Sequence, residues 1–142
     1  MSREVVFVDG MRTAFGTLGK TLSGILGEEM AGLCMKGLIE RSKILEKGGV
    51  VDCCFMGSAI GPLPAINGAR WPTLAAGLPD TTSASYVEMQ CGSAIDSINH
   101  AAWKILAGQA DIIIAGGYES YSSAPARFPM NVPPFRMIPP LP

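Results

Sequence analysis

The residue of this 142-residue chain that is best placed for chemistry is Cys91, which lies between a predicted strand and a clearly predicted helix. A thiol in this position faces the unpaired backbone N–H groups and the positive dipole end of the helix. Both features favour the thiolate, which is the nucleophilic form of cysteine. The same N–H groups are suited to hold an oxyanion, and Gly92 leaves room for a substrate. Cys91 is therefore a candidate nucleophile, and a buried structural cysteine is the alternative interpretation.

A nucleophilic cysteine needs a general base, and His100 is the only histidine in the sequence. It follows Cys91 along the same predicted helix at an axial distance of about 13 Å, because each helical residue adds about 1.5 Å. A hydrogen-bonded pair needs about 3 Å. We therefore interpret His100 as a residue of the helix surface or the core. If Cys91 is catalytic, its acid–base partner must come from another chain.

A second candidate motif lies at residues 14–21, where the sequence AFGTLGKT nearly matches the phosphate-loop pattern GxxxxGK[ST]. The pattern begins with a glycine whose permissive backbone the phosphate cradle requires, and this chain has Ala14 there. The helix signal after Lys20 is also weak. We interpret Lys20 as a solvated lysine in a loop.

The third candidate is the pair Gly116-Gly117, followed by Glu119, after a predicted strand. The ends of strands are where α/β sheets place ligands. The alternative is a tight turn with close backbone packing. Glu119 has two corresponding interpretations, as a general base or as a carboxylate that caps or pairs with its surroundings.

Composition excludes several functional classes. Charged residues make up 16% and hydrophobic residues 48% of the chain, which predicts one folded domain with a large partner interface. The net charge of -1 leaves no basic excess for nucleic acid. No apolar run reaches the roughly 18 residues of a membrane span, and no signal peptide precedes the first charges. No cysteine pair has the CxxC spacing of a metal site. We expect a cytoplasmic protein without metal or membrane contact.

Hydrophobic periodicity predicts an α/β fold, with a mostly parallel sheet and helices on both faces. The expected strands cover residues 5–8, 50–60, 85–89 and 112–115, and the expected helices cover 28–41, 68–78 and 92–107. Residues 12–24 are expected to form a loop with at most one helical turn. The fully apolar strand at 112–115 is expected to be central. The third helix should turn one stripe to the core: Ile95, Ile98, Ala102 and Ile105.

The chain divides into a core at residues 1–124 and a tail at residues 125–142. Seven of the 11 prolines lie in the tail, which also carries many apolar residues. Prolines exclude helix and central strand, and a solvated linker would be polar. We predict an extended arm that packs on a partner chain.

Four segments of the chain match the motifs of a known family. The segment at residues 12–16 (RTAFG) is similar to RTPFG, and residues 67–79 are similar to NPARQAALAAGLP. Residues 91–94 (CGSA) are similar to the CGSG around that family's nucleophile, and residues 108–120 are similar to GQADVMVAGGMES. With these segments in this order, the chain resembles the thiolase family from about residue 3 to residue 125.

The resemblance implies that Cys91 is acylated by an acyl-CoA and that its backbone N–H donates to the oxyanion. The implied reaction is reversible Claisen condensation of acetyl-CoA or acyl-CoA, or thiolysis of a 3-oxoacyl-CoA. Coenzyme A thioester is then substrate, and no cofactor is bound covalently. Gln90 and Gly92 would lie near the acyl group. Glu88 departs from the family's asparagine, and an acid there would oppose the thiolate.

Thiolases are nearly three times longer than this chain. The family's loop domain and second half have no counterpart here, and that half supplies the base histidine, a second cysteine and most oxyanion donors. The resemblance thus implies a thiolase-like N-terminal half-domain completed by another chain. We expect the small, nucleophile-bearing subunit of a split, hetero-oligomeric acetyl-CoA C-acetyltransferase, whose larger thiolase-like partner supplies the missing residues. The alternatives are a truncated fragment of a full-length thiolase and a non-catalytic scaffold subunit.

Overall fold

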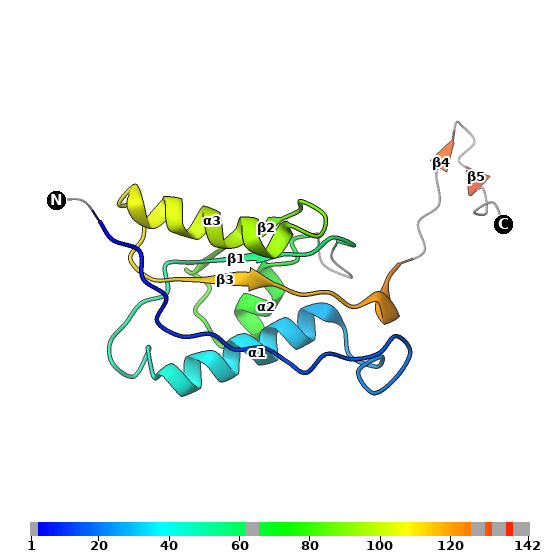
Figure 1. The fold of residues 1–142 in the computed structure, drawn as a ribbon, viewed down its shortest axis with the longest axis horizontal. Coiled ribbons are helices and arrows are strands. Elements are labelled where there is room, and N and C mark those ends of the chain that lie inside the picture. Colours follow the sequence, from blue (N-terminus) through cyan, green and yellow to red (C-terminus); the bar gives the residue numbers. More distant parts are fainter. Residues whose placement is uncertain (1–2, 62–65, 126–129, 132–135, 138–142) are drawn as a thin grey trace.

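A three-stranded parallel sheet forms the centre of the molecule. The computed structural model describes residues 3–61, 66–125, 130–131 and 136–137. Strand β1 (Cys53–Gly57) lies between β2 (Ser83–Val87) and β3 (Ile113–Gly117), which gives the order β2-β1-β3 (Figure 1). Gly57 is in register with Val87 on one side and with Gly117 on the other. All three strands therefore end at the same edge of the sheet.

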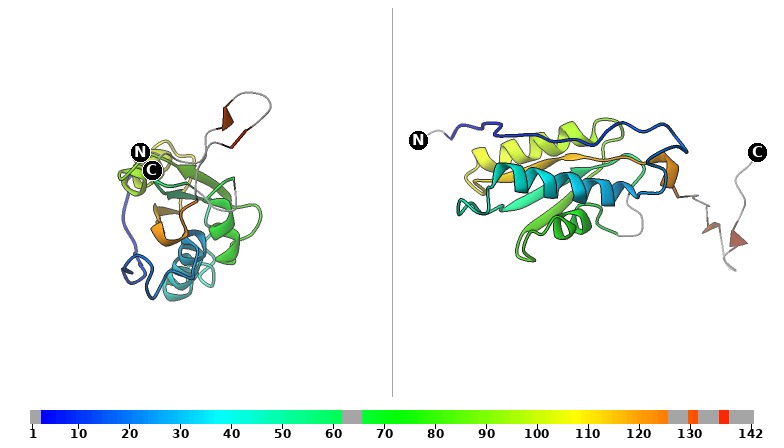
Figure 2. Two further views of the ribbon diagram at one scale, coloured as in Figure 1. Left: turned by 90° about the vertical axis from the view of Figure 1, so that its right-hand side faces the viewer. Right: turned by 90° about the horizontal axis from the view of Figure 1, so that it is seen from below.

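Helices cover both faces of this sheet, as the sequence predicts. Helices α1 (Gly27–Ser42) and α2 (Arg70–Ala75) pack on one face, and α3 (Ser93–Leu106) packs on the other (Figures 1 and 2). A 3-10 turn, η1 (Tyr121–Ser123), follows β3, and two short strands, β4 (Met130–Asn131) and β5 (Arg136–Met137), pair antiparallel with each other. In the part of the chain that the structure describes, no helix is both long and apolar enough to cross a membrane.

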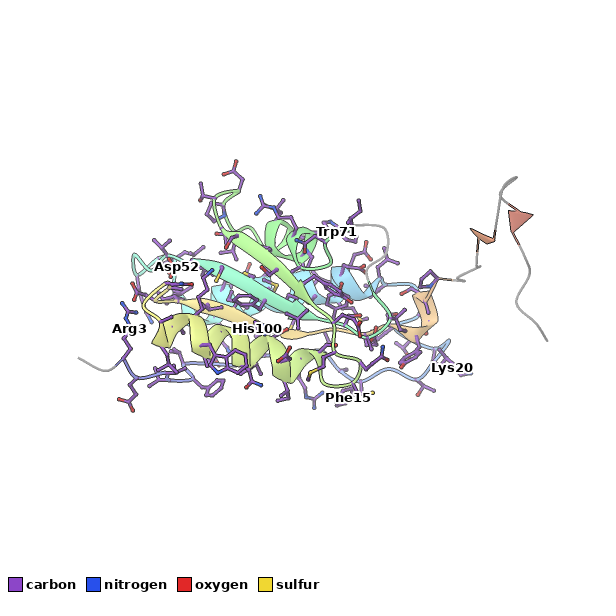
Figure 3. The ribbon with its side chains drawn as sticks, turned by 90° about the horizontal axis from the view of Figure 1, so that it is seen from above. Arg3, Phe15, Lys20, Asp52, Trp71 and His100 are labelled. Atoms are coloured by element: carbon purple, nitrogen blue, oxygen red, sulfur yellow. The ribbon has the colours of Figure 1, made fainter. Side chains whose placement is uncertain are left out.

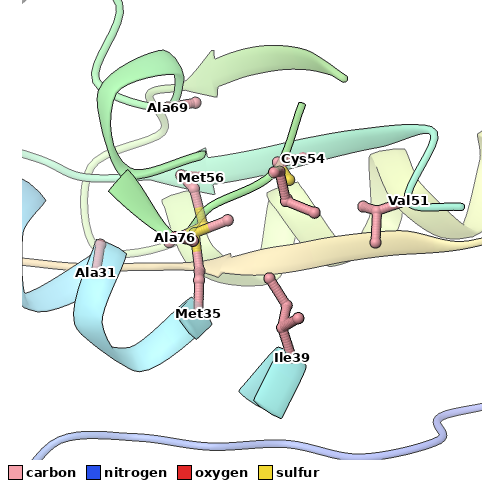
Figure 4. Packing of buried hydrophobic residues seen from close by; sticks show 9 residues of the cluster. Ala31, Met35, Ile39, Val51, Cys54, Met56, Ala69 and Ala76 are labelled. Carbon is pink, nitrogen blue, oxygen red and sulfur yellow. The ribbon is translucent and has the colours of Figure 1, made fainter. Parts of the chain in front are cut away.

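Strand β1 supplies both layers of the core, and all five of its residues are buried. Successive side chains of a strand point to opposite faces. Cys54 and Met56 accordingly join the cluster under α1 and α2, which Figure 4 shows with Met35 and Ile39 of α1. Cys53 and Phe55 face α3, where the smaller cluster is completed by Ala101. The central position of β1 thus joins two hydrophobic layers.

The predicted N-terminal strand is wrong. Residues 5–8 pair with no strand of the described sheet, and Phe7 is 83% exposed. The segment is tethered by ion pairs of 2.6 Å, Arg3 with Asp111 and Arg41 with Asp9, and the Arg41 hydrogen bonds lower the pKa of Asp9. A β-branched run favours a strand only when it has a ladder to join and a face to bury. The exposed ion pairs of this segment provide neither a neighbouring strand nor a buried face.

Two expectations about the sheet also need correction. The apolar strand at 112–115 lies at the edge of the described sheet, and β1 occupies the centre. The expected core stripe of α3 fails at Ile95, which is 63% exposed, because the helix turns the small residues Ser93, Ser97 and Ala101 to the sheet instead. Residues 12–24 form turns without a helix, as expected. Most of the predicted tail lies outside the described residues.

Asp52 links the beginnings of the two neighbouring strands β1 and β3. One oxygen of its carboxylate accepts the backbone N–H groups of Asp111 at 2.7 Å and Ile112 at 3.0 Å. These hydrogen bonds favour the charged form and hold the pKa of Asp52 below its usual value. The carboxylate therefore contributes stability that depends on its ionisation.

We predict that Asp52→Asn lowers the stability of the protein by about 0.5 to 1 kcal/mol at neutral pH, a small value because the site is exposed. A carboxyl with a lowered folded pKa stabilises above the unfolded value of about 4, and this stabilisation is lost as the pH falls through the folded pKa. Urea unfolding at pH 7 and pH 3 should show a difference between the two proteins that narrows in acid. A difference that is equal at both pH values would contradict this role.

Candidate functional site

Cys91 lies at the edge of the sheet where the strands end, in a turn that connects β2 to α3. Its thiol is exposed, and helix α3 begins two residues later with Ser93. The preceding residue, Gln90, has a φ of 48°, in the left-handed region that non-glycine residues rarely adopt. The chain therefore reverses sharply just before the thiol and presents it at the N-terminal end of the helix.

Side-chain hydrogen bonds fix this turn from both ends. The Glu88 carboxylate accepts the backbone N–H of Gln90 at 2.8 Å and its side-chain amide at 3.2 Å. The Ser93 hydroxyl accepts the N–H of Met89 at 2.8 Å and donates to the carbonyl of Gln90 at 2.6 Å. The Gly92 N–H donates to the carbonyl of Met89 at 3.0 Å. Hydrogen bonds from Glu88 and Ser93 thus hold the backbone of the turn that precedes Cys91.

Both predicted substrate-proximal residues, Gln90 and Gly92, have local roles in the same turn. The side-chain amide of Gln90 bends back and donates to the carboxylate of Glu88. A side chain at Gly92 would meet the end of the flexible Met89 side chain at 2.5 Å. Proximity of Gln90 and Gly92 to an acyl group stays a prediction.

Glycines at the strand ends allow α3 to approach the sheet. A Cβ atom at Gly57 would overlap the carbonyl group of Ser93, and one at Gly117 would lie 2.7 Å from the Cβ of Ala94. Real Cβ atoms do not come this close. The backbone of the first helical turn therefore rests directly on the ends of β1 and β3, which fixes the position of the turn that carries Cys91.

Among the four cysteines, all of them free thiols, Cys91 is the exposed one. Burial raises the pKa of Cys53, and it raises the pKa of Cys54 to about 11. Cys34 is half-buried, and burial raises its pKa as well. Since a raised pKa disfavours the thiolate, these three thiols are poor nucleophiles.

His100 lies on the surface of α3, as the sequence predicts (Figure 3). Its Nδ1 bonds the carbonyl of Asp96 at 2.8 Å, and its ring lies 5.4 Å from that of Trp103 and 5.9 Å from that of Phe55. Asp96 and Trp103 belong to α3 itself, and Phe55 belongs to the neighbouring strand β1. They give His100 a local structural role.

Glu119 pairs with the end of β1, which confirms the structural interpretation of this residue. Its carboxylate accepts the hydroxyl of Ser58 at 2.9 Å and the backbone N–H of Ala59 at 2.7 Å. Gly117 likewise permits close packing, as the tight-turn alternative expects. The segment after β3 thus supports the sheet edge.

Lys20 lies in an exposed loop, as predicted for the incomplete phosphate-loop motif (Figure 3). The loop is anchored by the Gly19 N–H, which donates to the Ser122 hydroxyl at 2.9 Å. A largely apolar cavity of about 660 Å³ lies between residues 11–18, α1 and residues 117–122. Cys91 is not among its lining residues. Across residues 3–61 and 66–125, no group of three or more His, Cys, Asp or Glu side chains is placed to hold a metal.

Comparison with known proteins agrees with this geometry. Residues 5–137 match the family described as the N-terminal domain of thiolase. The chain belongs to the thiolase family. An acetyl-CoA acetyltransferase of Chromobacterium violaceum is 38% identical over 134 residues, which are 94% of this chain and 34% of that protein. A beta-ketoadipyl-CoA thiolase of Escherichia coli is 37% identical over 87% of this chain and 31% of its own length.

Solved thiolase structures have the same fold. The acetyl-CoA acetyltransferase of Bacillus anthracis superposes with a TM-score of 0.71 at 33% identity, over 78% of this chain and 27% of that one. The Acat5 thiolase of Ascaris suum, solved with coenzyme A, gives a TM-score of 0.75 at 24% identity, over 86% and 31%. The fold is therefore that of a thiolase N-terminal half-domain. The chain spans about a third of the length of these relatives.

Ser93 and Gly57 both hold the turn of Cys91, and neither role was predicted from the sequence. A serine in the first turn of a helix commonly bonds the preceding backbone, which is a signal for Ser93. A glycine that ends a buried strand is a weaker signal for close approach by another backbone, as at Gly57.

We predict that Gly117→Ala lowers the stability of this thiolase domain by about 1 to 3 kcal/mol, because the new methyl group overlaps Ala94. Gly116→Ala is the matched control, since a Cβ there has no atom within 4 Å. The control should change the free energy of unfolding by less than about 0.5 kcal/mol. Equal losses in the two variants, measured by urea unfolding, would show that α3 does not rest on the strand ends.

Proposed function

We propose that this chain supplies the nucleophilic cysteine of a thiolase-type acyl transfer, as the small subunit of a split, hetero-oligomeric enzyme. The observation that carries the proposal is the exposed Cys91 thiol, held at the N-terminal end of α3 on the edge where the parallel strands end. The other three cysteines are buried or half-buried, and burial raises the pKa of each of their thiols.

The chemistry proceeds through an acyl-cysteine. The Cys91 thiolate attacks the thioester carbonyl of an acyl-CoA, the carbon–sulfur bond to coenzyme A breaks, and the departing thiolate takes a proton. A second acetyl-CoA then loses a proton from its α-carbon, and that carbon attacks the acyl group. A carbon–carbon bond forms as the Cys91 thiolate leaves. The reverse sequence is thiolysis of a 3-oxoacyl-CoA. Coenzyme A thioester is the substrate, with no covalently bound cofactor.

The backbone N–H of Cys91 is the proposed donor to the oxyanion that forms during each attack. Gln90 and Gly92 are the proposed neighbours of the acyl group. Departure of coenzyme A and loss of the α-proton both need acid–base groups. Glu88 is bound to Gln90, and His100 lies about 13 Å along the helix from Cys91. We therefore assign the base histidine, the second cysteine and the loop domain to a larger thiolase-like chain.

Exposed apolar side chains on the outer face of α3 support the proposal that a partner chain binds there. Ile95, Trp103 and Leu106 are 63%, 59% and 53% exposed, and they follow one face of the helix. Exposed apolar patches of this kind mark interaction surfaces. The proposed arm at residues 125–142 adds to that interface. Four free thiols fit a reducing compartment, so we place the enzyme in the cytoplasm.

Two alternatives share the same fold. The chain is a fragment of a full-length thiolase if the same polypeptide continues into the missing two thirds. It is a scaffold subunit if it binds a thiolase-like partner without reacting. The chain covers about a third of each relative, and all three interpretations account for this coverage.

We predict that acetyl-CoA acetylates Cys91 in the complex purified from its source, and that the chain without its partner does not turn over acyl-CoA. Mass spectrometry of peptides after acid quench should find one acetyl group on Cys91. Cys91→Ser should abolish labelling and reduce transfer by at least about a thousandfold, the scale on which loss of a nucleophile acts. Cys34→Ser is the control and should leave both intact. Full activity of Cys91→Ser would support the scaffold.

We predict that Ile95→Lys disrupts the complex with the larger chain. Leu33→Lys on α1 is the matched control, because both side chains are 63% exposed and neither change should destabilise the fold. Native mass spectrometry should show a stoichiometric second polypeptide of about twice this mass for the wild type and for Leu33→Lys, and a loss of at least tenfold in complex for Ile95→Lys. Retention of the complex by Ile95→Lys would place the interface elsewhere.

A further inference from the structure

We propose that Ser93 is a positioning residue for Cys91, because its hydroxyl locks the turn that aims the thiol at the N-terminal end of α3. The inference rests on the proposed function, since positioning matters only if Cys91 reacts. It adds a residue that never touches the acyl group.

One oxygen atom of Ser93 bonds two different residues of the turn. It accepts the N–H of Met89 at 2.8 Å and donates its proton to the carbonyl of Gln90 at 2.6 Å. The backbone N–H of Ser93 donates to the same carbonyl at 3.1 Å. The peptide unit between Gln90 and Cys91 is therefore held through its oxygen by two donors from the helix. Rotation of that unit would carry the thiol with it.

The turn needs this lock because Gln90 has a left-handed backbone, with a φ of 48°. This conformation is unfavourable for a residue with a side chain. Without the hydroxyl, the Met89 N–H loses its side-chain acceptor and the Gln90 carbonyl loses one donor. The turn is then free to relax toward ordinary backbone angles, which changes the direction of the Cys91 side chain.

Ser93 itself has little freedom to move. It is 2% exposed, and its carbonyl lies against Gly57 at the end of β1, where no Cβ would fit. Its carbonyl also accepts the Ser97 hydroxyl at 3.0 Å. The sheet thus fixes Ser93, and Ser93 fixes the turn. The end of β1 therefore sets the position of the Cys91 thiol, through the contact of Ser93 with Gly57 and the hydrogen bonds of Ser93 to the turn.

Ser97 provides a control of the same chemistry. It is buried at 0% exposure on the same face of α3, one helical turn further along. Its hydroxyl donates within the helix, to the carbonyl of Ser93, and does not reach the turn. Ser97→Ala therefore removes a buried hydroxyl from α3 without removing a bond to Met89 or Gln90.

The test compares the reactivity of the Cys91 thiol at two pH values. Wild type, Ser93→Ala and Ser97→Ala, each in its purified complex, are alkylated with iodoacetamide at pH 7 and at pH 10. Peptide mass spectrometry reports the rate at Cys91 alone. We expect Ser93→Ala to lower the ratio of the pH 7 rate to the pH 10 rate about three- to fivefold, the size of a charge–helix interaction. Ser97→Ala should stay within twofold of wild type at a similar loss of Tm.

A ratio in Ser93→Ala that equals that of Ser97→Ala would overturn the positioning role. Hydrogen exchange of the wild type tests the same contact without a variant: the Met89 amide should exchange at least tenfold more slowly than in an unfolded peptide, and unprotected exchange would overturn the proposal. Acetylation is measured separately. A protein that shows the ratio change but no acetyl-Cys91 retains the positioning role and loses the proposed function.

Discussion

The close approach of α3 to the ends of β1 and β3 is the constraint on which the rest of the structure depends. Gly57 and Gly117 have no side chains to separate the layers, so the first turn of α3 rests on strand backbone. This contact explains why small residues, Ser93, Ser97 and Ala101, face the sheet. It also places Cys91 at the edge of the sheet with little tolerance, because the turn before the helix is held by the helix itself.

Much of the fold follows from local sequence patterns, and what fails depends on tertiary context. The α/β class, the helix at 28–41 and the exposed Lys20 were predictable from periodicity and glycine positions. The strand at residues 5–8 was not, since propensity does not show whether a neighbouring strand is available. The stripe on α3 failed at Ile95 for a related reason. Periodicity predicts that the most hydrophobic residues of a helix face the core, whereas the ends of β1 and β3 admit only small side chains from α3.

The candidate site shows the same division. A cysteine before a helix and the position of the single histidine are visible in the sequence, so Cys91 could be chosen as the candidate nucleophile before the fold was known. The supporting roles of Ser93 and Glu88 were not predicted, because both residues act through backbone groups that the folded turn brings together. The α/β class that periodicity predicts agrees with membership of the thiolase family, and the chain spans about a third of the length of its relatives.

Adjacent Cys53 and Cys54 in the central strand have one more consequence. Their side chains enter opposite layers, one against α3 and the other against α1 and α2. Each thiol becomes reachable only when its own layer opens, so a slow thiol reagent would time the opening of each layer separately. The rates at which Cys53 and Cys54 are modified would therefore report separately on the opening of the two sides of the sheet.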